Sequence, residues 1–449
     1  MIRRIVDRRL VEGQNDISQA SYLSIQIKTL LIRFSSRVFF FDFVYYFHTN
    51  RGFSRTIMKR TISFFILVSF LLSLSGCTDL SEKNRRVEDI IVRVKTKYAP
   101  DKKLAVFNVT MTRTNKGLAL LGEVDNQDAK DAVVGAISPL VKKVTDSIMV
   151  LPDPKLAGRS WGIVSVSVAN MRGESDESSE LVSQATMGSV VRVLRERDGW
   201  DYLQTPDKYL GWMKGESFVR CSKGEADAWL AARKVIVLAT YETVRQYPQL
   251  HSGPVCDLVA GSILKNIGTA GIWTSVELPD GRKGFVPAGS IEDLELWKKK
   301  TEPTAEGVER TARSLLGVPY LWGGTSTKAM DCSGFTKTVY SMNGVQLNRD
   351  AYQQAWQGIE VLPGEKYQNL HKGDLIFFGR KAGENKPAEI LHVGMYLSNR
   401  MFIHSSGMVK ISSLDPASPV FDPNKIKSFI CARRIIPEPP TASAAALRR

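Results

Sequence analysis

The feature that most constrains this sequence is the stretch 319–336, which has the sequence P-Y-L-W-G-G-T-S-T-K-A-M-D-C-S-G-F-T. Gly323 and Gly324 suit a tight turn, because glycine accepts backbone angles that other residues avoid. Cys332 follows the turn, and residues 335–342 can continue as a helix. The positive end of a helix dipole favours the thiolate of a cysteine placed there. The stretch therefore indicates a nucleophile, although a small buried core cysteine is the alternative.

The positive charge of the chain is concentrated near its N-terminal end. The sequence has 449 residues and a formal net charge of +15, and such a length is typical of about three domains. Residues 1–77 contain 11 Lys or Arg and 4 Asp or Glu, which leaves 50 basic and 42 acidic residues in the rest of the chain. This later excess is dispersed, and no nucleic-acid motif accompanies it. We therefore expect no nucleic-acid partner and at most a weak attraction to an anionic polymer or membrane surface.

A secretory signal precedes the main body of the sequence. Residues 58–60 form a short basic start, residues 61–74 form an apolar run, and L-S-G-C ends the segment at Cys77. These are the parts of a signal peptide, and the apolar run is short for a membrane span, which makes a transmembrane anchor the weaker interpretation. The L-S-G-C ending resembles the bacterial lipobox. That resemblance implies cleavage before Cys77 and lipidation of its side chain.

The lipobox resemblance predicts a signal peptide at 58–76 and a lipid-anchored tether at 77–86 in a lipoprotein of the bacterial cell envelope. We expect the anchor to attach the protein to the membrane at the periplasmic face of the outer membrane. Residues 1–57 precede a complete signal and show no clear period. We interpret them as a non-functional upstream extension, with Met58 as the true start.

A small α+β domain is predicted at 87–155. Apolar residues at helical spacing predict helices over 87–98 and 128–141. Alternating or apolar runs predict strands over 105–112, 118–124 and 145–151. No residue of this segment suggests chemistry, so we expect it to serve attachment or spacing.

The next two segments, 160–225 and 231–296, contain short strands and turns in a similar order. D-K-Y-L-G-W ends the first at 207–212, and D-G-R-K-G-F-V occurs at the matching place in the second, from 280. The spacing indicates an internal repeat, and the short strands indicate small β-barrels. Each barrel resembles the bacterial SH3-like domain, which in secreted bacterial proteins implies contact with the wall or with peptides. We place the linker to the last domain at 292–300, which is charged and precedes Pro303.

The last domain, predicted at 302–435 and followed by a disordered tail at 436–449, holds three of the five histidines. A nucleophilic thiol needs a base, and the base needs a partner that orients it. His392 and His404 stand in two strand-like runs separated by Asn399-Arg400, which suits a hairpin turn. On adjacent strands they can lie side by side as base and orienter, whereas a single strand histidine is more often a core residue. His371 precedes a turn, and we expect it to be exposed and structural.

These residues resemble the NlpC-type cell-wall cysteine peptidases. The resemblance covers about 302–434 and rests on the motifs L-G-x-P-Y-x-W-G-G, D-C-S-G-F, G-D-L-I-F-F and H-V-G-M-Y, and on the late His404. It implies a papain-like domain with Cys332 as nucleophile, His392 as general base and acid, and His404 as the residue that orients His392. It also implies that Tyr320 directs its hydroxyl at the oxyanion, where a fixed donor in a dry site stabilises developing charge. The predicted fold class is therefore α+β and multidomain: a small N-terminal α+β domain, two SH3-like β-barrels and a C-terminal papain-like α+β catalytic domain.

Two SH3-like domains before such a peptidase resemble one subgroup, the γ-D-glutamyl-L-diamino acid endopeptidases. The subgroup cuts peptidoglycan stem peptides that carry a free N-terminal L-Ala, as in cell-wall turnover or recycling. It implies five substrate-binding residues: Glu180, Tyr209, Asp331, Ser333 and Asp350. Carboxylates suit an ammonium, which is costly to bury unpaired. The structural alternatives are a solvated loop acid for Glu180 and a helix cap for Asp350.

Two other functions stay open at this point. One is a related endopeptidase that acts on intact, amide-capped stems, and the other is a non-catalytic wall-binding lipoprotein. No metal or cofactor is expected, because Cys221, Cys256 and Cys431 are scattered and lack the spacing of metal ligands. An envelope location permits disulfides, and the sequence does not say which cysteines pair.

Overall fold

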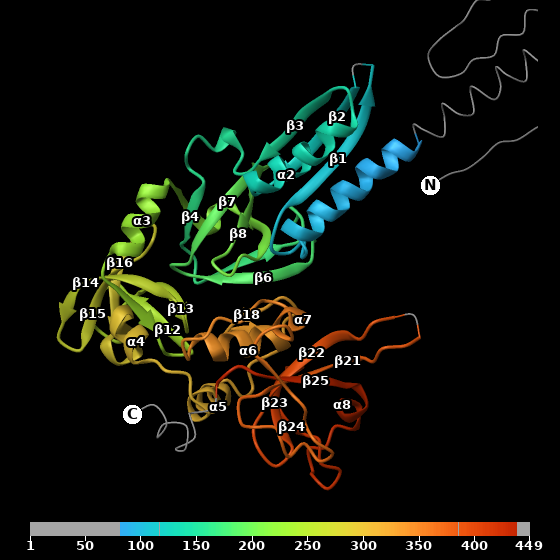
Figure 1. Ribbon diagram of the computed structural model, residues 1–449. Helices are drawn as coiled ribbons and strands as arrows, with labels where there is room; N and C mark the ends of the chain where they lie inside the picture. Colours follow the sequence, from blue (N-terminus) through green and yellow to red (C-terminus); the bar gives the residue numbers. More distant parts are fainter. Residues whose placement is uncertain (1–80, 116, 385, 438–449) are drawn as a thin grey trace, which may run out of the picture. The chain divides into compact units, whose positions relative to one another are not determined.

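The computed structural model describes residues 81–115, 117–384 and 386–437 (Figure 1). The predicted extension 1–57, the signal peptide 58–76, the lipidation site Cys77 and most of the predicted tail lie outside the described residues. Within the described ranges, no helix is both long and apolar enough to cross a membrane.

The first domain is a three-stranded sheet with two helices. Its elements are a helix over 81–98, β1 (Phe107–Thr114), β2 (Gly117–Val124), α2 (Gln127–Ile137) and β3 (Val144–Val150). Strand β2 pairs antiparallel with β1 and parallel with β3, and α2 makes the crossover. The predicted tether is wrong over 81–86, which are helical and carry an ion pair of 2.6 Å between Glu82 and Arg86, one turn apart. Helix α2 ends at residue 137, earlier than predicted, because Pro139 follows in a short 3₁₀ turn.

Two seven-stranded sheets follow, and they share one topology. The first contains β4 (Trp161–Val164), β5 (Val168–Arg172), β6 (Leu181–Thr186), β7 (Val190–Arg197), β8 (Trp200–Gln204), β9 (Leu210–Lys214) and β10 (Phe218–Cys221). The second contains β11 (Lys234–Val237), β12 (Tyr241–Arg245), β13 (Pro254–Val259), β14 (Ile263–Ala270), β15 (Trp273–Glu277), β16 (Lys283–Pro287) and β17 (Ile291–Asp293). The strand order is β10-β4-β7-β8-β9-β5-β6 in the first, and the equivalent strands follow the same order, β17-β11-β14-β15-β16-β12-β13, in the second. The predicted repeat is thereby confirmed.

The segment predicted as a linker belongs to the second barrel. Strand β17 pairs with β11, and α4 (Leu294–Lys300) follows at once. The side chain of Asp293 caps α4 by accepting hydrogen bonds from the amides of Glu295 and Leu296. The charged run therefore forms a capped helix, and the prediction of a linker at 292–300 is wrong. Helix α3 (Lys223–Ala231), with a capping box between Ser222 and Glu225, joins the two barrels.

The last domain packs helices against a six-stranded sheet. Its helices are α5 (Ala305–Ser314), α6 (Cys332–Ser341), α7 (Ala351–Gln354) and α8 (Pro423–Ser428). Its strands are the short β18 (Thr325–Ser326) and β19 (Ala329–Met330), and β20 (Ile359–Val361), β21 (Leu375–Arg380), β22 (Glu389–Tyr396), β23 (Met401–Ser406), β24 (Met408–Ser413) and β25 (Phe429–Arg434). The sheet order is β20-β25-β21-β22-β23-β24. Buried residues of α5 and α6, among them Val308 and Phe335, share one core with Phe377 and Met395 of the sheet.

The hairpin between β22 and β23 sets the position of the two histidines. Asn399 and Arg400 adopt φ values of 50° and 62°, as the predicted hairpin turn requires. The register pairs Met395 with Ile403, and its continuation sets His404 opposite Gly394. A Cβ at Gly394 would lie 3.2 Å from the Cβ of His404, so the missing side chain leaves room for the imidazole.

The first barrel is in direct contact with the loop before α6. The amide of Thr325 donates to the side chain of Gln184 at 3.0 Å, and its hydroxyl donates to the Gln184 carbonyl at 3.0 Å. Gly323 has a φ of +80°, and a Cβ there would lie 2.1 Å from the carbonyl oxygen of Leu181. The turn thus needs glycine for its conformation and for its close approach to β6.

Candidate active site

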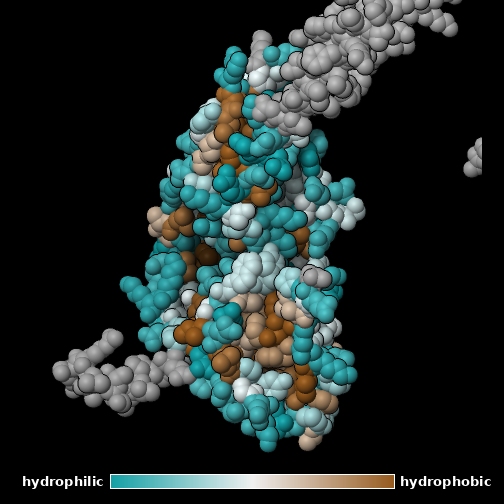
Figure 2. Space-filling view, turned by 45° about the vertical axis from the view of Figure 1, so that its right-hand side comes forward, coloured by the Kyte–Doolittle hydropathy of each residue, from teal (hydrophilic) through white to brown (hydrophobic). Residues whose placement is uncertain are grey.

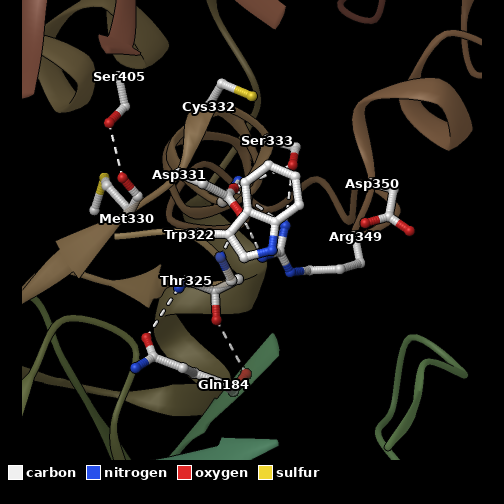
Figure 3. Close-up of polar contacts among 12 residues, drawn as sticks. Gln184, Trp322, Thr325, Met330, Asp331, Cys332, Ser333, Arg349, Asp350 and Ser405 are labelled. Atoms are coloured by element: carbon white, nitrogen blue, oxygen red, sulfur yellow. Dashed lines mark hydrogen bonds and ion pairs between the residues drawn. The ribbon is translucent and has the colours of Figure 1, made fainter. Parts of the chain in front are cut away.

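Cys332 is the first residue of α6, and a set of buried polar contacts fixes its backbone. The Asp331 carboxylate accepts hydrogen bonds from the amides of Gly334 at 2.7 Å and Gly323 at 2.9 Å. Arg349, only 2% exposed, donates to both oxygens of that carboxylate, at 2.6 and 3.2 Å (Figure 3). Asp331 therefore joins the glycine turn to the helix start and holds the cysteine at their junction.

The thiol of Cys332 is buried, and burial sets its protonation. Burial raises the pKa of Cys332 to about 11, and the negative charge of Asp331 adds to this. A hydrogen bond from the Val393 backbone and the charge of Arg349 oppose the rise. The helix dipole that the sequence analysis invoked does not prevail over the loss of solvation. At neutral pH the resting residue is a thiol, which needs a base to become a nucleophile.

Two histidines and a serine form a hydrogen-bonded series on three adjacent strands. The Nε2 atom of His392 lies 2.7 Å from Nδ1 of His404. Nε2 of His404 in turn lies 3.0 Å from the Oγ atom of Ser412 on β24. The predicted proximity of the two histidines is therefore confirmed. Ser412 was not predicted, because a serine near the end of a strand carries no distinguishing signal.

Both imidazoles are held in the neutral form. Burial, and then the charge of Lys425, lower the pKa of His392 well below its usual range. Burial also lowers the pKa of His404 to about 3. When His404 donates from Nε2 to Ser412, its Nδ1 accepts from Nε2 of His392. Nδ1 of His392 is then unprotonated, as a general base requires.

Tyr320 lies in the loop before α6 and is electrostatically coupled to the thiol. Its amide donates to the carbonyl of Gly407 at 2.9 Å, which fixes the backbone of the loop. Burial, together with negative charge on Cys332 and Asp331, raises the pKa of Tyr320 to about 12. The hydroxyl is therefore a protonated donor at every physiological pH.

A cavity of about 150 Å³ adjoins Cys332. Its walls bring together all five residues expected to bind substrate: Glu180, Tyr209, Asp331, Ser333 and Asp350. The first two come from the first barrel and the other three from the last domain, so the cavity lies where the two domains meet. The exposed Glu180 carboxylate accepts a hydrogen bond from the indole of Trp322 at 2.7 Å.

The two inner residues, Asp331 and Ser333, are committed to the protein. The Ser333 hydroxyl donates to Asp331 at 3.2 Å and accepts from Arg349 at 3.0 Å. Both are under 10% exposed. They line the cavity wall together with Arg349, which holds their side chains in place.

Asp350 contacts side chains from two other domains. It is the N-cap residue of α7, and its carboxylate accepts from the hydroxyl of Tyr209 at 3.1 Å. It also forms an ion pair of 2.9 Å with Lys103, which belongs to the N-terminal domain. The neighbouring Asp101 accepts from the hydroxyl of Tyr352 at 2.8 Å. The N-terminal domain, for which the sequence suggested only attachment or spacing, thus reaches the cavity through Lys103.

Apolar side chains are exposed at the mouth of the cavity. Trp322 is 60% exposed and Leu391 is 49% exposed, and both line the cavity. Figure 2 shows hydrophobic residues in the lower part of the visible face, with hydrophilic residues around them, and further hydrophobic residues near its top. Exposed apolar surface beside a cleft is typical of a binding site. His371, expected to be structural, is exposed and lies away from this cavity.

The other cysteines take no part in the site. Cys221, Cys256, Cys332 and Cys431 are all free thiols in the described part of the chain. Burial raises the pKa of Cys256 to about 11. Cys332 differs from them because it begins helix α6, lines the cavity and lies next to strand β22, which carries His392.

Comparison with known proteins identifies two segments of the chain. Residues 317–426 match the NlpC/P60 family, and residues 171–218 match the bacterial dipeptidyl-peptidase Sh3 domain. The chain is 30% identical over 275 residues to dipeptidyl-peptidase 6 of Lysinibacillus sphaericus, across 58% of this chain and 93% of that protein. It is 28% identical over 271 residues to a gamma-D-glutamyl-L-lysine dipeptidyl-peptidase of Bacillus cereus, across 58% of this chain and 77% of that protein.

A solved structure extends the likeness to the fold. The crystal structure of an NlpC/P60 family protein from Bacillus cereus matches 62% of this chain and 100% of its own, with a TM-score of 0.53 and 24% identity. These matches confirm the predicted fold class, with SH3-like domains ahead of a C-terminal domain of this type.

Proposed function

Because the chain belongs to the NlpC/P60 family and is a cysteine peptidase, we propose that it hydrolyses the bond between γ-D-Glu and the diamino acid in peptidoglycan stem peptides with a free N-terminal L-Ala. The observation that carries this proposal is the cavity beside Cys332, which is lined by Asp350, Glu180 and Tyr209. Carboxylates and a tyrosine hydroxyl suit an ammonium group. The names of the two relatives also support a cell-wall peptide substrate.

In the first half of the reaction, the sulfur of Cys332 attacks the γ-carbonyl carbon of D-Glu. Nδ1 of His392 takes the thiol proton as the bond forms, because the resting thiol is not ionised. The Tyr320 hydroxyl and backbone amides at the start of α6 donate to the oxyanion. The imidazolium then protonates the amine of the diamino acid, which leaves as the C–N bond breaks and a thioester remains.

In the second half, water attacks the thioester carbonyl. His392 takes a proton from the water and returns it to the sulfur, which leaves as the thiol. The product is the dipeptide L-Ala-γ-D-Glu with a new carboxyl group. His404 keeps the His392 ring oriented throughout, and Ser412 holds His404.

Selection of the substrate depends on its N-terminus. The ammonium group of L-Ala can form an ion pair with Asp350 and a second one with Glu180. An acylated nitrogen is uncharged and can form neither ion pair. We therefore infer a role after an amidase has released the peptide from glycan, in cell-wall turnover or recycling. We further propose, from the sequence of the leader, that Cys77 carries a lipid anchor at the periplasmic face of the outer membrane.

The direct test compares the tripeptide L-Ala-γ-D-Glu-L-Lys with its N-acetyl form. The enzyme should release L-Ala-γ-D-Glu from the free tripeptide and act at least about 100-fold less well on the acetylated one. Cys332→Ala should abolish both reactions. Equal rates on the two peptides would contradict the amine pocket and favour action on intact stems. Full activity of Cys332→Ala would contradict the peptidase assignment.

A further inference from the structure

Lys103 lies in the loop between the first helix and β1, and the first barrel holds its backbone. The Lys103 carbonyl accepts from the amide of Leu210 at 2.8 Å. The next carbonyl, of Leu104, accepts from the side chain of Gln204 at 2.8 Å. The loop is therefore fixed beside strands β8 and β9, next to Tyr209.

The side chain of Lys103 ends in a site built for an ammonium group. Its Nζ atom lies 2.9 Å from Oδ2 of Asp350. It also lies 5.9 Å from the ring centroid of Tyr209 and 5.8 Å from that of Tyr352. One carboxylate and two electron-rich rings within this range attract a cation. The site already holds an alkyl ammonium, supplied by the chain itself.

We propose that the Lys103 ammonium occupies the position of the substrate's N-terminal ammonium, so that a peptide binds by displacing it. This inference rests on the proposed function and adds a residue from the N-terminal domain to the specificity of the enzyme. Two cations repel each other at one carboxylate, so lysine and substrate compete for Asp350. Lys103 makes the pocket discriminate more strictly between charged and uncharged N-termini. Displacement of Lys103 breaks its ion pair with Asp350, and only a ligand with its own positive charge replaces that ion pair.

The exposure of the ion pair makes such displacement feasible. The Lys103 side chain is 40% exposed and that of Asp350 is 18% exposed. A partly exposed pair formed by a long flexible side chain is weak and is readily broken. The Lys103 side chain can move into solvent while Asp101, its neighbour, keeps the loop attached to α7 through Tyr352 and Gln353.

The test is the KM of the full-length enzyme for L-Ala-γ-D-Glu-L-Lys at low salt. Lys103→Met should lower this KM by about 2- to 5-fold, the factor that one partly exposed ion pair represents. Lys103→Arg should keep the wild-type KM, because it retains the competing charge. Lys102→Met is the matched control, since Lys102 is the exposed neighbour in the same loop, and it should leave KM unchanged. Lys103→Gln serves as a second neutral variant if Lys103→Met does not fold.

An unchanged or higher KM in Lys103→Met or Lys103→Gln would overturn the inference. A higher KM would instead make Lys103 a ligand of the substrate, for example of its carboxylate. The proposed function fails separately, when wild-type enzyme cleaves neither the free nor the N-acetyl tripeptide. If the wild-type enzyme prefers the free tripeptide and Lys103→Met leaves its KM unchanged, only the proposed role of Lys103 is contradicted.

Discussion

The Nε2 atom of His392 lies 2.7 Å from Nδ1 of His404, and this hydrogen bond joins two adjacent strands of the catalytic sheet. The bond leaves Nδ1 as the only ring nitrogen through which His392 can act on the thiol. The orientation of His392, the proposed base, thus depends on a side chain from the next strand.

His404→Ala should lower kcat by about 100-fold or more, because His392 loses the partner that fixes its ring and tautomer. Steady-state kinetics on the free tripeptide provide the measurement. Ser412→Ala should have a smaller effect, about 3- to 10-fold, and Ser412→Thr should restore the rate because it returns the hydroxyl. A wild-type kcat in His404→Ala would show that His392 needs no orienting partner.

Arg349→Met should lower the free energy of unfolding by about 3–5 kcal/mol, because it leaves the buried Asp331 carboxylate without its counter-charge. Urea denaturation provides the measurement. Arg313→Met is the matched control: Arg313 pairs with Glu309 on the surface of α5 at 2.8 Å, and such a pair contributes less than about 1 kcal/mol. Similar losses in the two variants would contradict a special role for the buried pair.

The acid limb of kcat/KM should lie below pH 6.5. The pKa of His392 is lowered by burial and by Lys425, so the neutral base persists at a pH where an ordinary histidine is protonated. Alkylation of Cys332 by iodoacetamide should rise steadily above pH 8, since burial raises the pKa of its thiol to about 11. An acid limb of kcat/KM at pH 7, or an alkylation rate that reaches a plateau near neutral pH, would instead indicate that Cys332 and His392 rest as a thiolate–imidazolium pair.

The same lowered pKa values affect stability with a defined sign. The unfolded chain takes up protons on His392 and His404 below about pH 6.5, while the folded chain does not, so stability is lost as the pH falls. Thermal unfolding followed from pH 7 to pH 4.5 should therefore show a falling Tm. His404→Gln should flatten this dependence, and an unaltered slope would argue against a neutral buried His404.

Gly323→Ala should destabilise the protein by about 1–3 kcal/mol and lower kcat/KM, since the glycine has a positive φ and approaches the Leu181 carbonyl. Gly289→Ala is the control, because a Cβ at Gly289 meets nothing within 4 Å. Thermal unfolding and tripeptide assays on both variants test the contact. Equal stability and equal kcat/KM in the two variants would mean that the turn can move away from the barrel without a loss of stability or activity.

Local patterns in the sequence predicted the parts of the site that depend on local structure. The Asn399-Arg400 pair favours a tight hairpin, and a hairpin brings residues 12 apart together, as with His392 and His404. The place of Cys332 at a helix start was likewise predicted from the glycine turn before it and the helix-prone run after it, whereas the N-cap role of Asp331 was not predicted. Each of these predictions uses a few neighbouring residues whose geometry is fixed by one turn.

Contacts between domains could not be predicted in this way. Lys103 and Asp350 are 247 residues apart and meet only because the first barrel, the N-terminal domain and α7 pack together. Nothing in the local composition near Lys103 marks it as different from Lys102. The predicted linker failed for a related reason: a charged run forms a helix when the preceding aspartate caps it and a barrel strand adjoins it.

The two barrels share one strand order, but equivalent residues in them make different contacts. Tyr209 and Arg282 occupy the same place in the repeated D-x-x-x-G-[WF] motif, directly before β9 and β16 respectively. Tyr209 donates to Asp350 in the catalytic domain, whereas Arg282 donates to the Val255 and Ser165 carbonyls of the barrels themselves. One copy therefore contacts the candidate active site, whereas the other contributes to the packing of the barrels. An exchange of the two copies would therefore keep the strand order and remove the contact between Tyr209 and Asp350.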